Sequence, residues 1–317
     1  MRMYLGLSAF FAFCVISVGT TSAQSGAWYA SAEALILDRN NTFTDPLVID
    51  EDNFPNPVLT GDDLNFGAAG GPKLTLGRLA DNGAALEAVY FGRNDWVATA
   101  SVTGNNNRSV PGDLALGTFD FFAVDQIDVT YGSQIDNFEL NYVRHFDGLR
   151  LLAGFRYFEL DEDFRIASFD NDTFLSDYLI DTQNRLYGGQ LGAAYSLFGS
   201  TREGAPWELS AGLKAGVFGN ANQQTTLLRD LNNALVLRDL TVEGDSTAFI
   251  GEINLNAKVN VWRNLDLVVG YNLLWVEGVA LAPYQLDFTD TADSSDFVDS
   301  THGVFYHGVN VGLAATW

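Results

Sequence analysis

The sequence predicts an all-β fold, a transmembrane antiparallel up-and-down β-barrel of about ten strands. Three observations predict it. Apolar residues alternate with small or polar ones along ten segments, short and long connections between the segments take turns, and the last residue is an aromatic, Trp317. A period of two is typical of strands rather than helices. A soluble sandwich, the main alternative, would mix short and long loops at both ends.

The first 23 residues have the composition of a secretory signal peptide. One cation, Arg2, precedes an apolar run, and the small residues at 21–23 follow that run. This order predicts export and cleavage before Gln24 rather than a membrane anchor. We therefore expect one barrel domain over residues 24–317, with long acidic extracellular loops.

Composition narrows the class of protein further. The single cysteine, Cys14, lies inside the expected signal segment, so the mature chain would have no thiol for disulfides, zinc sites or nucleophilic catalysis. The formal net charge is -23, which repels nucleic acid and attracts cations. No stretch after the signal approaches the roughly 18 uncharged apolar residues of a membrane-spanning helix. We therefore expect strands to cross the membrane.

The ten strands follow one another with alternating connections. They are expected at 26–37, 64–79, 84–103, 126–146, 149–169, 182–198, 207–227, 246–262, 265–282 and 303–317. The short connections are 80–83, 147–148, 199–206 and 263–264, and the long ones are 38–63, 104–125, 170–181, 228–245 and 283–302. Short turns at one end and long loops at the other are typical of a bacterial outer-membrane barrel with both termini in the periplasm. Twelve strands are the alternative, with an extra turn near Gly132.

The clearest hairpin turns at Asp147-Gly148, a pair that favours a type I′ turn. A two-residue turn here places Leu140 opposite Phe155 and Glu139 opposite Arg156. One face then carries an apolar ladder and the other an ion pair. We expect the ladder to face lipid and the charges to face the lumen.

The same sorting on the other strands places charged residues on the face that lacks large apolar side chains. These residues are expected to line the lumen, as selectivity elements of a channel or, in the alternative, as a plug. They are Glu33, Lys73, Glu87, Glu139, Arg150, Arg156, Lys214, Glu252, Lys258 and Asp266.

All six tryptophans lie near expected strand ends or a membrane boundary. Amphipathic rings at such positions form interfacial belts in barrels. The expected interfacial aromatics are Trp28, Trp96, Trp207, Trp262, Trp275 and Trp317.

Several stretches resemble the beta-barrel porin-7 family of bacterial outer-membrane proteins. They are "WYASAEALILDR" at 28–39, "LRLLAGFRYFELDEDFRI" at 149–166, "NRLYGGQLGAAYS" at 184–196 and the final strand. The resemblance implies an outer-membrane location and a porin-like function. The carboxy-terminal aromatic, in the outward register of the last strand, resembles the signal by which the barrel-assembly machinery recognises such proteins.

The long loops raise the question of cofactors and catalysis. They are rich in aspartate, but none follows the spacing of a known calcium motif, so we expect an acidic solvated surface and no cofactor, with loop-bound divalent cations as the alternative. The pair suited to proteolysis is His302 with Asp299 or Asp296. A single histidine in an acidic loop is usually incidental, and no serine-elbow, zinc or phosphate motif is present in the sequence. We expect no enzyme.

These observations predict a porin-like passive diffusion channel for small hydrophilic solutes or ions, narrow and cation-attracting. Its expected partners are outer-membrane lipid and the assembly machinery, and not nucleic acid. The alternative is a non-conducting structural or adhesive outer-membrane protein with a charge-plugged lumen. Ten strands favour this alternative, because side chains fill the interior of a barrel of about eight strands.

Overall fold

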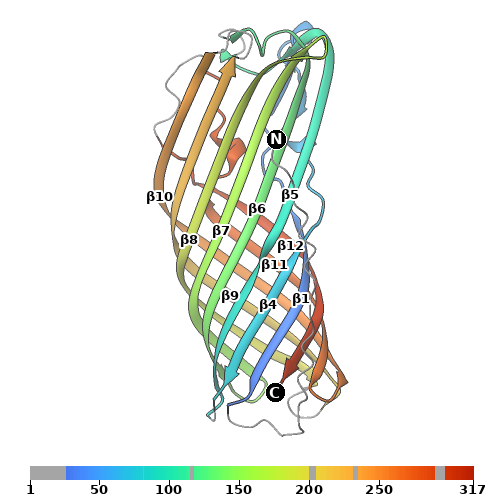
Figure 1. Cartoon of the computed structure of the whole chain (residues 1–317), viewed down its shortest axis with the longest axis vertical. Helices are drawn as coiled ribbons and strands as arrows, with labels where there is room; N and C mark the ends of the chain where they lie inside the picture. The colour runs from blue at the N-terminus through green and yellow to red at the C-terminus, as the bar shows by residue number, and fades with distance from the viewer. Residues whose placement is uncertain (1–25, 81, 115–117, 200–204, 231–234, 290–296) are drawn as a thin grey trace.

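The computed structural model describes residues 26–80, 82–114, 118–199, 205–230, 235–289 and 297–317. The expected signal peptide, 1–23, lies outside the described residues. Twelve strands of the described chain form one antiparallel sheet, and ten of them close into a barrel (Figure 1). No helix in the described part is long and apolar enough to span a membrane.

The barrel strands neighbour one another in chain order, and β12 pairs back with β1. They are β1 (Trp28–Arg39), β4 (Ala69–Leu79), β5 (Ala84–Ser109), β6 (Val124–His145), β7 (Leu149–Asp170), β8 (Thr173–Gly199), β9 (Trp207–Asp230), β10 (Leu235–Trp262), β11 (Leu265–Val279) and β12 (His302–Thr316). The expectation of ten barrel strands is confirmed. The alternative of an extra turn near Gly132 is wrong, because β6 runs through that position without a break.

The two additional strands come from the first long connection. β2 (Pro46–Asp50) and β3 (Pro57–Thr60) form a hairpin, and β2 pairs with the end of β5. Two single-turn helices, η1 (Glu51–Asn53) and η2 (Gly61–Asp63), follow β2 and β3. A segment expected as a loop therefore carries its own small sheet.

The barrel is strongly staggered. Partners followed around the wall from Ala315 on β12 return to that strand at Gly303, twelve residues away. Such a shear tilts the strands against the barrel axis, and it sets an interior narrow enough for side chains to fill.

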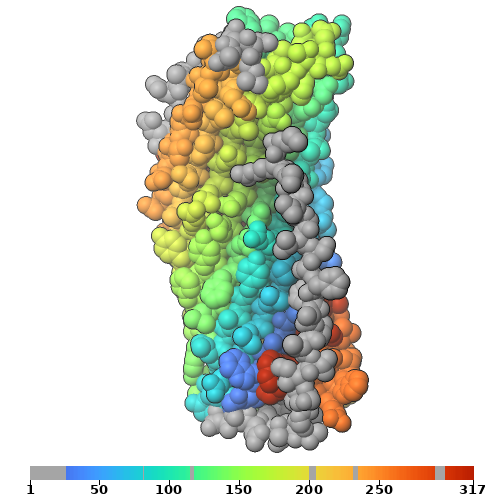
Figure 2. Space-filling view, viewed as in Figure 1, coloured from blue at the N-terminus to red at the C-terminus, as the bar shows by residue number. Residues whose placement is uncertain are grey.

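The strands differ greatly in length. β8 has 27 residues and β10 has 28, whereas β1 has 12 and β4 has 11. A bilayer needs only about 9–11 residues per strand. The lower half is therefore a closed barrel, and β5–β10 continue beyond it as a curved wall that we call the tower (Figure 1). In Figure 2 the side chains of β7, β8 and β10 form part of this wall.

The tower corrects the expected loop lengths. The connection expected at 170–181 is a two-residue turn, Asn171-Asp172, because β7 and β8 pair as far as Asp170 and Thr173. Apolar alternation fades here because the outward face meets water instead of lipid, whereas backbone pairing does not depend on that alternation. A loop prediction based on alternation alone ends the strand too early.

The β6–β7 hairpin has the expected register, with Leu140 opposite Phe155 and Glu139 opposite Arg156. Its turn type differs from the expectation. Only Gly148 has a positive φ, +67°, among the two turn residues, whereas a type I′ turn needs positive φ at both.

The outward face of the lower half is apolar, with Leu191 68% exposed and Phe155 48% exposed. This band ends at two tyrosine–carboxylate pairs. The Tyr90 hydroxyl donates to Asp136 at 2.7 Å, and the Tyr157 hydroxyl donates to Glu159 at 3.1 Å. Tyrosines between an apolar band and an acidic surface are typical of a membrane boundary.

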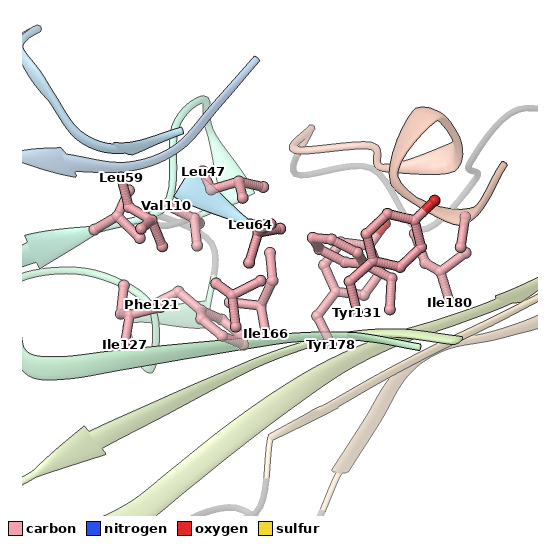
Figure 3. Close-up of a cluster of buried hydrophobic side chains, with 14 of the residues drawn as sticks. Leu47, Leu59, Leu64, Val110, Phe121, Ile127, Tyr131, Ile166, Tyr178 and Ile180 are labelled. Atoms are coloured by element: carbon pink, nitrogen blue, oxygen red, sulfur yellow. The ribbon is translucent and has the colours of Figure 1, made fainter. Parts of the chain in front are cut away.

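The interior contains two large apolar clusters. One lies inside the tower, where Leu47, Leu64 and Phe121 of the inward-folded loops pack against Ile127 and Ile166 of the wall (Figure 3). The other crosses the barrel below it. The sorting of charges suggested a polar inward face. The structure shows that this face also carries large apolar clusters.

Candidate functional site: the barrel lumen

The lower lumen holds a network of four charged side chains from two hairpins. The Lys214 ammonium lies 2.8 Å from Glu139 and 2.9 Å from Glu252, and the Arg156 guanidinium lies 3.1 Å from Glu252 and 3.7 Å from Glu139. The Glu139 side chain is 0% exposed and that of Arg156 is 1% exposed. Two cations and two anions thus alternate in a buried site.

Amide side chains complete this network. Asn141 and Gln190 donate to the second oxygen of Glu139 at 2.9 and 2.8 Å. Arg156 Nε donates to the side-chain oxygen Oδ1 of Asn137 at 2.6 Å. Buried charges that are paired and hydrogen-bonded hold their neighbours in one arrangement, and removing one partner leaves an uncompensated charge.

Four further expected lumen charges form two pairs nearer the short-turn end. Lys73 lies 3.5 Å from Glu33, and Arg150 contacts Glu87. The Tyr29 hydroxyl also donates to Glu87, at 2.9 Å. These pairs lie apart from the four-residue network.

The last two expected lumen charges are partly exposed near the turns. Lys258 lies opposite Glu208 in the register of β9 and β10, and Asp266 accepts a hydrogen bond from Asn260 at 2.8 Å. The structure brings neither of them to the network.

A second buried charge pair was not expected from the sequence. Arg39, at the end of β1, contacts Glu162, and its guanidinium also donates to the Tyr131 hydroxyl at 2.7 Å. Glu162 was not among the expected lumen charges, but it is only 3% exposed. The signal was present, because Glu162 continues the inward register of Arg156.

The connection after β11 folds into the lumen and is held there by side chains of the wall. The Asn184 amide donates to the carbonyl of Ala280 and accepts from the amide of the same residue, both at 2.7 Å. Glu162 accepts from the Ala282 amide at 3.0 Å, and Asn220 donates to the Gly278 carbonyl at 3.1 Å. These bonds hold the start of this connection, which includes η4 (Ala282–Gln285).

An apolar layer lies between this connection and the charge network. Every one of the ten barrel strands contributes to this buried cluster, and none of the ten residues named here is more than 9% exposed. They are Leu35, Ala69, Phe91, Ile135, Phe158, Leu186, Phe218, Ile250, Leu274 and Tyr306. The layer spans the bore from wall to wall.

The expected aromatic belt needs one correction. Trp96 is 2% exposed, its indole nitrogen donates to the Leu37 carbonyl at 3.1 Å, and its ring packs 5.1 Å from that of Tyr306. A bulge at Arg93, with φ +60°, shifts the register of β5 and turns the following even-numbered residues inward. Trp96 is therefore a lumen residue.

The other tryptophans lie on the outward face or at strand ends. Trp28, Trp207, Trp262 and Trp317 are exposed, and partly buried Trp275 packs 5.2 Å from Phe305. Trp28 also lies under the guanidinium of Arg78, 5.5 Å from its ring centre.

The expected His302–Asp299 contact exists, at 3.2 Å, while Asp296 lies outside the described residues. Thr301 donates to the same aspartate through its amide and hydroxyl, at 3.0 and 2.7 Å. Burial raises the pKa of Asp299, but the Thr301 and His302 contacts outweigh it and hold the pKa below its usual range. The His302 ring stacks on Tyr284 at 3.5 Å. This geometry shapes the turn into β12.

The acidic loops do not assemble a metal centre in the part of the chain that the structure describes. No group of three or more His, Cys, Asp or Glu side chains is arranged there to hold an ion.

One solved structure supports the barrel fold, and two others are weaker likenesses. The outer membrane protease OmpT from Escherichia coli is 13% identical with a TM-score of 0.50, and the match covers 95% of this chain and 99% of that one. Neisserial surface protein A is 11% identical, with a TM-score of 0.28 over 92% and 98%. The P. putida toluene transporter TodX is 10% identical, with a TM-score of 0.35 over 93% and 90%. No curated protein matches the sequence significantly.

A family model matches residues 121–317, more than half of the chain. The matched region includes the resembling stretches at 149–166 and 184–196 and the final strand, and the stretch at 28–39 lies outside it. With the closed ten-strand barrel, this match places the protein in the bacterial outer membrane. The chain belongs to the family described as "Putative beta barrel porin-7".

Proposed function

We propose that this protein is a closed outer-membrane scaffold, structural or adhesive, that holds its tower and loops above the membrane. One observation carries the proposal: the apolar layer crosses the bore and takes a buried side chain from each of the ten barrel strands. The wall supplies these ten side chains, so their place in the layer does not depend on a loop that could move aside, and Leu281 of the connection after β11 adds to the same cluster. Buried apolar side chains that pack as closely as in a protein interior also exclude water and ions.

The charges below the layer support the same function. In a cation-selective channel, carboxylates would face water, whereas the Glu139 carboxylate is buried and bonded to Lys214 and two amides. The network therefore acts as a charge plug beneath an apolar plug. The family description weighs toward the diffusion channel, and the packing of the bore weighs against it.

Single-channel recording of the refolded protein in planar bilayers tests the proposal. Wild type should insert silently, with the barrel verified by circular dichroism and heat-modifiable migration on gels. A positive control combines Phe158→Ala, Phe218→Ala and Leu274→Ala with Glu139→Ala and Arg156→Ala, which removes three large side chains of the apolar layer and one ion pair of the charge network and should produce conducting steps. Stable cation-selective steps from wild type would overturn the scaffold function in favour of the diffusion channel.

A further inference from the structure

The loops at the far end of the tower form one surface, which we call the crown: residues 50–54, 105–108, 113, 118–123 and 170–172. Asp125 holds its parts together. One of its carboxylate oxygens accepts from the backbone amide of Asn106 and the other from the backbone amide of Asn171, both at 3.0 Å. Asn107 donates to Asp52 at 2.8 Å. Turns from three separate connections are thus held in one arrangement.

The crown carries an excess of negative charge. Asp52, Asp113 and Asp172 are exposed. Arg108, the arginine within these residues of the crown, forms an ion pair with Asp50 at 3.1 Å. On the tower wall, Arg165 and Arg229 both bind Asp177, at 3.2 and 2.7 Å.

Two phenylalanines stand out from this acidic surface. Phe54 is 68% exposed and Phe119 is 71% exposed. Both loops that carry them are attached at the end of β5, because Ser109 pairs with Ile49 of β2 and its hydroxyl accepts from the backbone amide of Ala123 at 2.9 Å. The two rings therefore belong to one end of the molecule.

The backbone of Phe119 is strained. Its φ is +58°, in the left-handed region that bulky residues rarely adopt. Its neighbours Thr118, Asp120 and Phe121 are 9%, 7% and 0% exposed. A strained residue that points its ring into water, in a loop anchored on both sides, is typical of a preorganised contact residue.

We propose that the crown is a docking surface for a cationic protein segment that buries the Phe119 ring in an apolar contact. Charge complementarity selects this occupant: the exposed carboxylates of Asp52, Asp113 and Asp172 attract lysine and arginine and repel anionic lipid and nucleic acid. Aromatic side chains, phenylalanine among them, are enriched at protein interfaces. This inference deepens the adhesive role in the proposed function and rests on it.

The experiment compares two synthetic peptides of equal length and charge. Both contain lysine–glycine repeats, one with two central leucines and the other with two central serines. Binding is measured to the full-length protein in zwitterionic nanodiscs, with empty nanodiscs as the blank. The leucine peptide should bind wild type about tenfold more tightly, equivalent to about 1.4 kcal/mol. Both affinities should fall between about 0.1 and 1 M salt, where the Debye length falls from about 10 to 3 Å.

Phe119→Ser should reduce the tenfold preference to about one, whereas Val97→Ser should keep it, because Val97 is exposed on the wall outside the crown. Phe119→Gly separates binding from folding. Glycine relieves the positive φ, so the melting temperature should stay equal or rise while the preference is lost.

Three results would overturn the proposal: equal binding of both peptides to wild type, an unchanged preference in Phe119→Ser, or a lower melting temperature in Phe119→Gly. Phe119-dependent binding of anionic lipid vesicles would identify a bilayer as the occupant instead, and would also overturn it. Conduction by wild type in planar bilayers would contradict the closed scaffold but leave the peptide preference intact, so the two failures are distinguishable.

Discussion

Lys214 Nζ lies 2.8 Å from Glu139 Oε1, closer than Arg156 Nη1, which lies 3.7 Å from the same oxygen. Arg156 is the cross-strand partner of Glu139 on β7, whereas Lys214 comes from β9. The buried charge network therefore joins the β6–β7 hairpin to β9 and β10 past the intervening strand β8.

Removing the Glu139 charge should destabilise the barrel. In Glu139→Gln, the buried cations Lys214 and Arg156 would share Glu252 alone, so we expect the free energy of unfolding to fall by about 3–5 kcal/mol. Urea titration followed by tryptophan fluorescence measures it. Arg185→Gln is the matched control, because the exposed Arg185–Glu159 pair, at 3.6 Å, should contribute less than about 1 kcal/mol.

A Glu139→Gln variant within about 1 kcal/mol of wild type would mean that water solvates these charges. That result would favour a hydrated lumen and hence the channel.

Trp96 should differ from the outward tryptophans in its access to lipid. In a protein that retains only Trp96, brominated lipids should leave the fluorescence unquenched, because the ring lies inside the barrel. A protein that retains only Trp207, 48% exposed, should be quenched strongly. Quenching of Trp96 to the same extent would contradict the register shift at Arg93.

Local rules were sufficient for the lower barrel. Alternation and the Asp147-Gly148 turn predicted the pairing of Glu139 with Arg156, because one face contacts lipid and a one-residue slip would move every apolar side chain to the wrong face. The same logic failed at Trp96. A bulge inserts one residue and inverts the two faces. Gly92 lies directly before Arg93, and a glycine inside a strand often marks a bulge, but alternation alone does not locate the inserted residue.

The lumen was harder to predict than the wall. The charges at Glu139 and Lys214 were expected there, but their pairing depends on which strands approach across the bore, and periodicity within one strand does not contain that information. Phe158 and Phe218 lie in the inward register of their strands. When the inward and the lipid-facing sides of a strand are both apolar, alternation no longer shows which side faces the lumen. Asn184 and Ala280, which are hydrogen-bonded, lie 96 residues apart in sequence. A pattern within one strand cannot predict such a contact.

Asn184→Ala should loosen the connection that folds into the lumen. It removes both hydrogen bonds to Ala280 and the one accepted from Asn220 at 3.0 Å, and it leaves buried backbone groups unsatisfied. Limited proteolysis should cleave residues 286–289 several-fold faster than in wild type. The variant should remain silent in bilayers, because the wall side chains of the apolar layer stay in place.

Asn254→Ala is the control for Asn184→Ala, because the hydrogen bonds of the Asn254 amide within the described chain go to the side chains of Glu252 and Asn256. It should leave the rate of cleavage unchanged. Conduction by Asn184→Ala would mean that the connection, rather than the apolar layer, closes the bore.

The crown should lose its order in acid. The amides of Asn171 and Asn106 hold the pKa of Asp125 below its usual range, so these bonds stabilise the folded loops above the ordinary aspartate pKa of about 3.9. The stabilisation falls as the pH drops through the lower, folded pKa. Hydrogen exchange at Asn106 and Asn171, corrected for the intrinsic pH dependence, should accelerate in that range. Asp125→Asn should show fast exchange already at neutral pH, whereas Asp113→Asn should match wild type. Equal protection in Asp125→Asn and wild type would show that Asp125 does not order the crown.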